Sequence, residues 1–240
     1  MSNIFNIQPI EKRVESNGQV LDVHSIFYTI QGEGPYSGWP CVFVRLAGCN
    51  LQCPSCDTEY TQGRKTYSLF DLMSAIEDEF AAAPRRLVVI TGGEPFRQNI
   101  VPMIKLLNSQ NIHVQIETNG TQMPPDGFGT LYANDQVTVV CSPKAGKVQQ
   151  GLFPFIDAYK YVLDSESQHH DGLPFAALNH TVGPKGVARP HDGFDGPVYL
   201  QPMDPKDDAQ YVQNVQAVKN ACLTFGYILQ LQTHKIIGVE

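Results

Sequence analysis

Short apolar segments alternate with amphipathic or loop-rich stretches along most of the chain. Segments rich in β-branched and aromatic residues predict strands, and these are residues 20–30, 41–46, 87–90, 114–116, 137–141, 158–163, 198–200 and 227–231. Helical periodicity or end signals predict helices over residues 68–80, 99–110 and 207–225. Strands that alternate with helices or long loops imply parallel pairing through right-handed crossovers. The pattern therefore predicts an α/β fold of mostly parallel strands.

The boundaries of these helices carry local signals. Ser68 and Asp71 have the spacing of a capping box at the start of the first helix. Pro102 is tolerable only in the first turn of the second helix. Acidic residues open the third helix, where they suit the helix dipole, and Gly226 can end it.

Two stretches carry no regular pattern. Residues 1–18 have no continuous apolar core, so we expect a mobile N-terminal arm and not a signal peptide. Residues 164–197 are rich in Gly, Pro, Asp and His. A structureless loop that long is unusual in a compact domain, so we expect some helix within it and a role at a surface or interface. Residues 19–240 are then expected to form one domain, with 164–197 as a loop-rich insertion.

Composition narrows the class of protein. The 240 residues carry 17 Lys plus Arg and 24 Asp plus Glu, a net charge of -7, which argues against nonspecific nucleic-acid binding. No apolar run reaches the roughly 18 residues expected of a membrane span. The six cysteines are clustered or lie in apolar runs, which fits a reducing cytoplasm better than a secreted disulfide framework. We therefore expect a cytoplasmic protein that acts on a small molecule or meets a basic partner.

Polar and glycine-rich motifs directly follow several predicted strands. They include TGGEP at 91–95, ETNG at 117–120, SPK at 142–144 and QPMD at 201–204. Each motif alone is explained by an ordinary turn, but their shared position is not. Because chemistry in parallel α/β folds gathers at the carboxyl ends of strands, we expect these motifs to meet in one site.

Three cysteines form the most specific motif of the chain. Cys49, Cys53 and Cys56 have the spacing C-x3-C-x2-C, and three such thiolates can hold one face of a 4Fe-4S cluster. Such a cluster usually has four cysteine ligands, and no fourth cysteine lies nearby. One iron would then be open to a substrate or cofactor. Zinc is the alternative, but structural zinc sites have four ligands, and His24 and His113 are far away in sequence.

With GGEP beside it, the cysteine motif resembles that of the radical S-adenosylmethionine (SAM) enzymes. The resemblance implies that the open iron binds SAM, and that the reduced cluster splits SAM into methionine and a 5'-deoxyadenosyl radical. The GGE-type loop contacts the amino group of the methionine moiety in that superfamily. Gly92, Gly93 and Glu94 are therefore expected to do so here.

A longer series of motifs is similar to the 7-carboxy-7-deazaguanine synthase family. In order, these motifs are QGEG, FVRLAGCN, CDT, VVITGGEP, QIETNG, SPK, LQPMD and QTHK, from about residue 27 to residue 235. The resemblance implies an incomplete, modified TIM-like barrel, a homodimer, and a need for Mg²⁺ besides the cluster and SAM. It implies conversion of 6-carboxy-5,6,7,8-tetrahydropterin to 7-carboxy-7-deazaguanine with loss of ammonia, in queuosine-type 7-deazapurine biosynthesis. The radical would remove a hydrogen atom from C6 before the ring contracts, with SAM regenerated and no side chain acting as acid or base.

The resemblance also implies a role for individual residues. Cys49, Cys53 and Cys56 would hold the cluster, and the hydroxyl of Thr58 would bind Mg²⁺. The residues expected to bind the pterin are Ile30, Gln31, Gly32, Glu33, Arg45, Thr91 and His234. Those expected to bind SAM are Gly92, Gly93, Glu94, Ser142, Pro143, Lys144, Gln201, Pro202, Met203 and Asp204.

Two features depart from the expected pattern. Many radical SAM proteins carry an aromatic residue just before the third cysteine, near the adenine, but this chain has Ser55 there. Residues 164–197 match no motif.

A glycyl-radical activating enzyme shares the cysteine spacing and is the alternative enzyme. A noncatalytic iron–sulfur electron-transfer protein is the alternative outside enzymes, although the missing fourth cysteine speaks against it. An enzyme of this type would also need an electron donor such as a flavodoxin.

Overall fold

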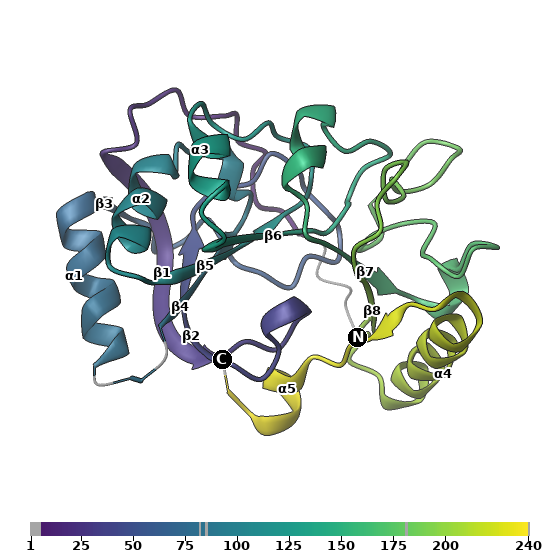
Figure 1. The fold of residues 1–240 in the computed structure, drawn as a ribbon. Helices are drawn as coiled ribbons and strands as arrows, with labels where there is room; N and C mark the ends of the chain where they lie inside the picture. The colour runs from purple at the N-terminus through teal and green to yellow at the C-terminus, as the bar shows by residue number, and fades with distance from the viewer. Residues whose placement is uncertain (1–5, 82, 85, 181, 240) are drawn as a thin grey trace.

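A curved sheet organises the part of the chain that the structure describes, residues 6–81, 83–84, 86–180 and 182–239. In this computed structural model, the nine strands of the described residues follow the order β3-β1-β2-β4-β5-β6-β7-β8-β9 (Figure 1). Their bounds are β1 (Val20–Ile30), β2 (Pro40–Leu46), β3 (Lys65–Ser68), β4 (Leu87–Gly92), β5 (His113–Thr118), β6 (Val137–Cys141), β7 (Ala158–Leu163), β8 (Val198–Pro202) and β9 (Ile228–Leu229). Edge strands β3 and β9 are not neighbours in the described sheet, so the barrel stays open.

One strand of the described sheet, β1, runs opposite to all the others. Strands β2 and β4 through β9 pair in parallel, which confirms the predicted α/β class of mostly parallel strands. Strand β1 is antiparallel to both β2 and β3. Ile30, the last residue of β1, therefore pairs with Pro40, the first residue of β2. The QGEG motif therefore lies at the end of the sheet where the parallel strands begin. The other motifs lie where those strands end, so QGEG does not follow the carboxyl end of a parallel strand as expected.

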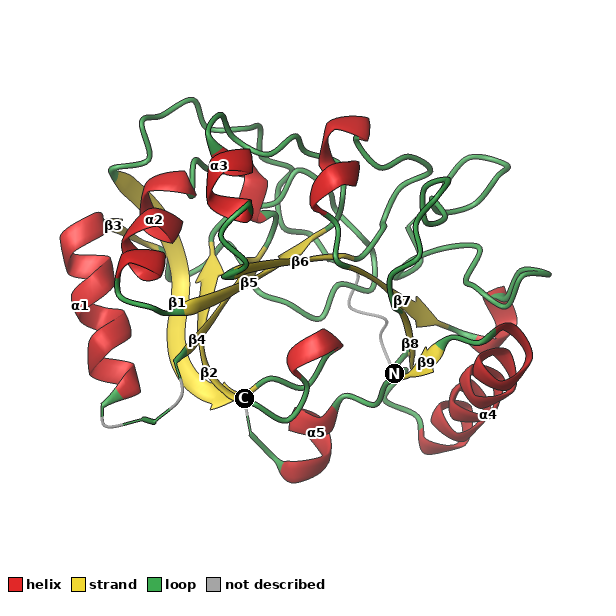
Figure 2. Ribbon diagram, viewed as in Figure 1, coloured by secondary structure: helices red, strands yellow, loops and turns green. Residues whose placement is uncertain are grey.

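The loop that carries QGEG folds onto the concave side of the sheet (Figures 1 and 2). It includes the 3-10 turn η1 (Gly34–Tyr36). Tyr36 and Trp39 pack against a small cluster formed by the buried residues Cys41, Leu87 and Val89. Because Cys41 and Leu87 lie at the beginnings of β2 and β4, the loop covers that end of the concave face.

Helices cover the convex side of the sheet and one of its ends (Figure 2). The helices are α1 (Leu69–Phe80), α2 (Val101–Ser109), α3 (Phe128–Tyr132), α4 (Asp208–Phe225) and α5 (Thr233–Ile237). Further 3-10 turns are η2 (Pro95–Arg97), η3 (Gln150–Phe155) and η4 (Ser165–Ser167). Helix α5 lies on the open, concave side, whereas α1 to α4 lie outside. Among the described helices, none is both long enough and apolar enough to cross a bilayer.

Local signals fix the ends of the long helices as predicted. The hydroxyl of Ser68 accepts a hydrogen bond from the backbone N–H of Asp71 at the start of α1. Asp207 caps α4 through Gln210, and Gly226 ends α4 with a φ of 79°. Helix α1 buries Leu72 and Ile76 against the sheet, where they join the main core with residues of β2, β4 and β5. This apolar stripe is the reason that α1 packs on the convex face.

Three short elements were not predicted from the sequence. Strand β3 is an exposed four-residue edge, and α3 and α5 have five residues each. The helix expected within residues 164–197 is limited to the single turn η4. Backbone contacts hold the rest of that segment; for example, the N–H groups of Phe175 and Val187 donate to the carbonyls of Ser167 and Phe175.

Asn214 joins α4 to the loops that follow β7 and β8. Its side chain is completely buried in the middle of α4. Its Oδ1 accepts from the N–H of Ser165 at 2.8 Å, and its Nδ2 donates to the carbonyl of Met203 at 2.9 Å. A buried amide of this kind stabilises the fold only while both of its partners are present.

We predict that Asn214→Ala lowers the free energy of unfolding by about 1–3 kcal/mol, because two backbone groups lose their buried partner. Gln213→Ala changes an exposed neighbour on the same helix and should stay within about 0.5 kcal/mol of the parent. Urea unfolding followed by circular dichroism measures both values. Equal stability of the two variants would contradict this role of Asn214.

Candidate active site

The cysteine loop lies between β2 and β3. Cys49 and Cys53 are buried, and Cys56 is partly buried. Burial raises the pKa of Cys49 to about 12 and that of Cys53 to about 11, and the neighbouring cysteines oppose ionisation further. Thiols in such surroundings become thiolates only when a metal supplies the compensating charge. The three sulfur atoms therefore suit a cationic metal group better than nucleophilic chemistry.

The turn that contains GGEP packs directly on the cysteine loop. A Cβ atom at Gly93 would lie 2.0 Å from the carbonyl oxygen of Gly48, and one at Gly92 would lie 2.1 Å from that of Leu46. The N–H of Gly93 donates to Leu46, and the N–H of Glu94 donates to Gly48. Only glycine permits this close approach. Gly92 and Gly93 thus bring the end of β4 against the loop after β2.

Glu94 joins this turn to the end of β5. Its carboxylate is completely buried and accepts from the hydroxyl of Thr118, the N–H of Asn119 and the N–H of Phe96. Burial raises the pKa of Glu94 to about 7, although these three hydrogen bonds oppose the rise. The side-chain amide of Asn119 in turn lies 4.0 Å from the sulfur of Cys49. The ends of β2, β4 and β5 therefore meet at the cysteines, as the sequence predicted.

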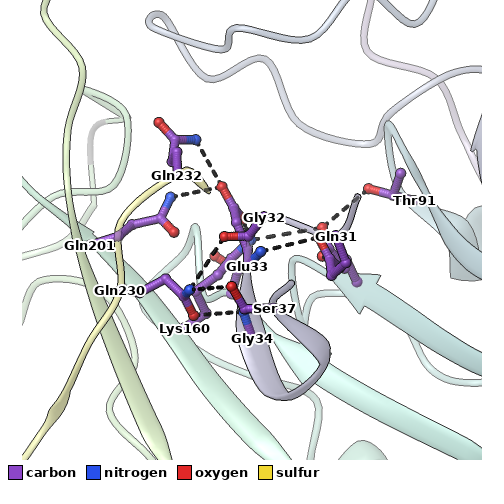
Figure 3. A network of polar contacts seen from close by, with 12 residues as sticks. Gln31, Gly32, Glu33, Gly34, Ser37, Thr91, Lys160, Gln201, Gln230 and Gln232 are labelled. Carbon is purple, nitrogen blue, oxygen red and sulfur yellow. Dashed lines mark hydrogen bonds and ion pairs between the residues drawn. The ribbon is translucent and has the colours of Figure 1, made fainter. Parts of the chain in front are cut away.

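A polar network fills the concave side of the sheet around Glu33 (Figure 3). Lys160, from β7, forms an ion pair with Glu33 and lies 3.7 Å from a carboxylate oxygen of Glu117 in β5. Gln201 and Gln232 donate to Glu33 at 3.1 Å and 2.8 Å. Side chains from β7, from β8 and from the chain after β9 thus converge on the Glu33 carboxylate, and Lys160 links it to Glu117 of β5.

Gln31 and Thr91 extend this network toward β4. Gln31 donates to Glu117 at 3.0 Å, and the hydroxyl of Thr91 lies 3.4 Å from the other oxygen of Glu117. Gln230 accepts from the N–H of Gly34 at 2.7 Å and so fixes the QGEG backbone. The structure therefore brings Gln31, Glu33 and Thr91, which were expected to bind the pterin, together with Gln201, which was expected to bind SAM.

Lys160 keeps this buried network charged. Burial alone would raise the pKa of Glu33, but the Lys160 ammonium and hydrogen bonds from Lys160, Gln232 and Gln201 lower it to about 2. Burial would likewise lower the pKa of Lys160, but the Glu117 and Glu33 carboxylates raise it above its usual value. One cation between two carboxylates leaves a net negative charge that suits a ligand rich in N–H donors.

His234, which was expected to bind the pterin, and its neighbour Lys235 lie in α5. A Cβ atom at Gly32 would lie 2.0 Å from Nδ1 of His234, so the imidazole rests on the QGEG backbone. Lys235 lies 3.2 Å from Asp204 and 3.7 Å from Asp57 in the cysteine loop. The QTHK motif therefore links three parts of the site.

Arg45 and Thr58 lie on either side of the cysteines in sequence. Arg45, in β2, pairs with Thr91 of β4, and its guanidinium lies 5.7 Å from the centre of the Phe27 ring. The hydroxyl of Thr58 lies 3.3 Å from a carboxylate oxygen of Asp57. Both side chains are partly buried or exposed to solvent at the site, which leaves them available for a ligand.

The residues expected to bind SAM fall into two groups. Ser142 and Pro143 are buried after β6, and the ammonium of Lys144 lies 2.6 Å from the hydroxyl of Ser142. Gln201 and Pro202 are buried in β8, whereas Met203 is half-buried and Asp204 is exposed. The Asp204 side chain accepts a hydrogen bond from the ammonium of Lys235. Ile30, which was expected to bind the pterin, is the last residue of β1 and lies directly before QGEG.

Sequence reasoning assigned no individual role to several members of the network, although some of them lie within the motifs QIETNG and QTHK. They are Gln115, Glu117, Lys160, Gln230 and Gln232. The available signal was a charged or amide residue inside an apolar strand, such as Lys160 between two tyrosines in β7. Such a residue in a buried strand needs a polar partner, which identifies a polar interior.

Ser55, which stands where an aromatic residue was expected, contacts residues 178–179. The N–H of Ser55 donates to the carbonyl of Leu178, and its hydroxyl accepts from the side chain of Asn179 at 2.7 Å. Leu178 and Asn179 have φ angles of 50° and 58°, which non-glycine residues rarely adopt. The unmatched segment 164–197 thus contacts the cysteine loop at the position where an aromatic residue was expected.

The residues present fit the predicted groups in chemical type. The side-chain oxygens of Gln115 and Gln201 are buried without a hydrogen-bond partner among the described residues, so they can accept from a polar ligand. No group of three or more His, Cys, Asp or Glu side chains in the described ranges is arranged around one point for a single metal ion. This does not describe a 4Fe-4S cluster, because each cysteine of a cluster binds a different iron.

We predict that Lys160→Met destabilises the protein by about 3–5 kcal/mol at about pH 7, because Glu33 remains buried without its cation. In the parent, ionised Glu33 stabilises the fold above its ordinary pKa of 4.5, and this contribution is lost as the pH falls toward about 2. In the variant, burial raises the pKa of Glu33, so the folded state gains stability as the pH falls.

Urea unfolding of this variant and its parent at about pH 7 and about pH 5 should therefore give the larger difference at the higher pH. Lys105→Met, at an exposed position of α2, provides the control and should cost little at either pH. A difference between parent and Lys160→Met that does not depend on pH would argue against the ion pair.

Comparisons with known proteins agree with this site. A family model described as a 4Fe-4S single cluster domain matches residues 30–124, which include the three cysteines and GGEP. The crystal structure of QueE from Escherichia coli has a TM-score of 0.65 to this chain at 23% sequence identity, over 88% of this chain and 93% of that one. This likeness confirms the predicted fold, an incomplete TIM-like barrel.

Two relatives extend over nearly the whole chain. The 7-carboxy-7-deazaguanine synthase of Rhodospirillum rubrum is 37% identical over 98% of this chain and 100% of its own length. That of Rickettsia prowazekii is 36% identical over 99% of this chain and 96% of its own. The resemblance drawn from the motifs is thereby confirmed, and the chain belongs to the 7-carboxy-7-deazaguanine synthase family.

Proposed function

We propose that the chain is a radical SAM enzyme that converts 6-carboxy-5,6,7,8-tetrahydropterin to 7-carboxy-7-deazaguanine with release of ammonia. The observation that carries this proposal is the contact between the C-x3-C-x2-C loop and the GGEP turn, beside an interior lined with carboxylates and amides. Membership of the family supports the same reaction. When bound, the 4Fe-4S cluster and SAM supply the 5'-deoxyadenosyl radical.

The polar interior suits the pyrimidine edge of a pterin. That edge carries amino and ring N–H donors, and Glu33 and Glu117 offer carboxylate acceptors. The unpartnered oxygens of Gln115 and Gln201 add two further acceptors. Lys160 keeps Glu33 ionised, so an acceptor is ready before the substrate arrives. Gln31, Gly32 and His234 would complete the pocket.

Arg45 and Thr58 suit the other end of the substrate. The guanidinium of Arg45 can bind the pterin carboxylate with two parallel hydrogen bonds. Thr58 would contribute its hydroxyl to a Mg²⁺ ion that also binds the carboxylate, since Mg²⁺ prefers oxygen ligands and retains water. Together these residues would orient the pterin with its reacting carbon toward the cluster side of the interior.

The residues around the cysteines suit SAM. Backbone groups of Gly92 and Gly93 and the SPK turn at 142–144 border the cysteine loop. Glu94 would contact the amino group of SAM and also hold the ends of β4 and β5, because its carboxylate accepts from Thr118 and Asn119. Residues 201–204 would bind SAM through the buried Gln201 and Pro202 and the neighbouring backbone.

The assembly and surroundings of the enzyme are part of the same proposal. Exposed apolar side chains on β9 and α5, namely Ile228, Leu229 and Ile236, suit contact with a second subunit in a homodimer. An external one-electron donor such as a flavodoxin would reduce the cluster. A cytoplasmic location fits the free cysteines, which need a reducing compartment.

We predict that anaerobically reconstituted protein holds about one 4Fe-4S cluster and, with reductant, SAM and Mg²⁺, forms the deazapurine acid from the carboxypterin. Mass spectrometry detects the product, and iron analysis counts the cluster. Cys53→Ala should lose both, while Cys222→Ala, outside the motif, should retain both. Cleavage of SAM with the pterin left intact would exclude the proposed substrate and favour an activating enzyme.

We also predict that Thr58→Ala raises the Mg²⁺ concentration for half-maximal rate by roughly tenfold or more, because one oxygen ligand is lost. The apparent KM for SAM should stay the same. Thr130→Ala, at an exposed position of α3, is the matched control. An unchanged Mg²⁺ requirement in Thr58→Ala would remove this threonine from the metal site.

A further inference from the structure

The cysteine loop obtains little support from regular secondary structure. Residues 49–61 lie outside the helices and strands of the described chain. Their backbone N–H and C=O groups therefore lack the internal partners that a helix or sheet supplies, and each buried group needs another partner. Chelation of a cluster by three cysteines requires this irregular loop to keep one conformation.

The N-terminal segment supplies many of these partners. We call residues 6–14 the strap, because they run along the cysteine loop. The N–H of Asn6 donates to the carbonyl of Pro54 at 2.9 Å, and the N–H of Glu11 donates to that of Cys49 at 2.7 Å. Ile10 and Cys49 form a parallel β-bridge. The side chain of Asn6 also donates to the carbonyl of Cys53 at 3.2 Å.

Gln8 makes the densest contact between the strap and the loop. Its Nε2 donates to the carbonyl of Thr58 at 2.9 Å, and its Oε1 accepts from the N–H of Tyr60 at 2.7 Å. The hydroxyl of Thr61 donates to the same oxygen at 2.9 Å. Because a carbonyl only accepts and a backbone N–H only donates, these partners fix the orientation of the Gln8 amide. The side chain thus pairs with the loop as a neighbouring strand would.

Glu11 holds the other end of the strap. Its carboxylate contacts Arg64 at 2.5 Å, and it lies 3.3 Å from the guanidinium of Arg97. The Arg97 side chain is buried and donates to the carbonyl of Ala47, just before the cysteine motif. The N–H of Val14 donates to the carbonyl of Arg97. The strap is therefore attached on both sides of Cys49 and beyond Cys56.

We propose that the strap holds the cysteine loop in its cluster-binding conformation, with Gln8 as the positioning residue. Gln8 contacts the segment directly after Cys56, and Asn6 and Ile10 contact the residues around Cys53 and Cys49. The strap thereby contacts the backbone of Cys49 and of Cys53, and it contacts Thr58, two residues after Cys56. The inference rests on the proposed cluster site, but it does not depend on which substrate the enzyme transforms.

These contacts are made by part of the N-terminal arm that the sequence predicts to be mobile. The sequence predicted mobility for residues 1–18, and residues 6–14 within them make the contacts just described. Mobility itself stays a prediction for the arm as a whole. The strap role requires only that residues 6–14 rest on the loop while the cluster is bound.

The test uses Gln8→Met, which keeps the length of the side chain and removes its hydrogen bonds. In reconstituted protein, hydrogen exchange at the Tyr60 amide should become about 5 to 30 times faster, since the three lost bonds are each of modest strength. Loss of the cluster to an iron chelator, followed by its visible absorbance, should accelerate by a similar factor. Exchange in β4 and β5 should stay unchanged.

Ile7→Ala is the matched control, because Ile7 lies in the strap with 88% of its surface exposed. It should leave both rates unchanged. The proposal requires both effects in Gln8→Met: faster exchange with normal cluster retention, or normal exchange, would overturn it. Because neither readout uses the pterin, a failed substrate assay leaves this test intact, and a failed strap test leaves the proposed reaction intact.

Discussion

The buried ion group of Lys160, Glu33 and Glu117 is the constraint on which the interior of this barrel depends. A buried charge is tolerated only with partners, so each of these residues requires the others. They come from β7, from the loop after β1 and from β5, which are separated by many residues of chain. The ion group therefore fixes how far the QGEG loop enters the concave side, and with it the shape of the space left for a substrate.

A second constraint, purely steric, joins this interior to the cysteines. Gly92 and Gly93 let the end of β4 touch the backbone of residues 46–48, where no side chain has room. Glu94 then ties the same turn to Thr118 and Asn119. Thr91 lies one residue before this turn and reaches Glu117. One short turn thus connects the backbone of the cysteine loop with the side chain of Glu117 by direct contacts.

Much of the fold and part of the site could be predicted from the sequence. Strands such as 137–141 and the caps at Ser68 and Gly226 depend on local patterns, and they were found at or near their predicted ends. The antiparallel direction of β1 was missed, because nothing within residues 20–30 encodes its partner. Lys160 was missed for the same reason, because it is an isolated polar residue in an apolar strand. Glu117 belongs to the ETNG motif, but its contact with Lys160 arises only when the fold brings the two strands together. Strap contacts such as those of Gln8 are equally nonlocal. Isolated polar residues near a terminus form no sequence pattern that predicts such contacts.

The strap and the cluster are linked by more than proximity. If the strap favours the loop conformation that binds the cluster, the cluster must favour the docked strap by the same free energy, because binding linkage is reciprocal. The barrel core does not share this dependence, since its strands are held by continuous ladders and buried apolar contacts. Stability is therefore divided between a sheet that persists without the cofactor and a cysteine loop whose order grows with it.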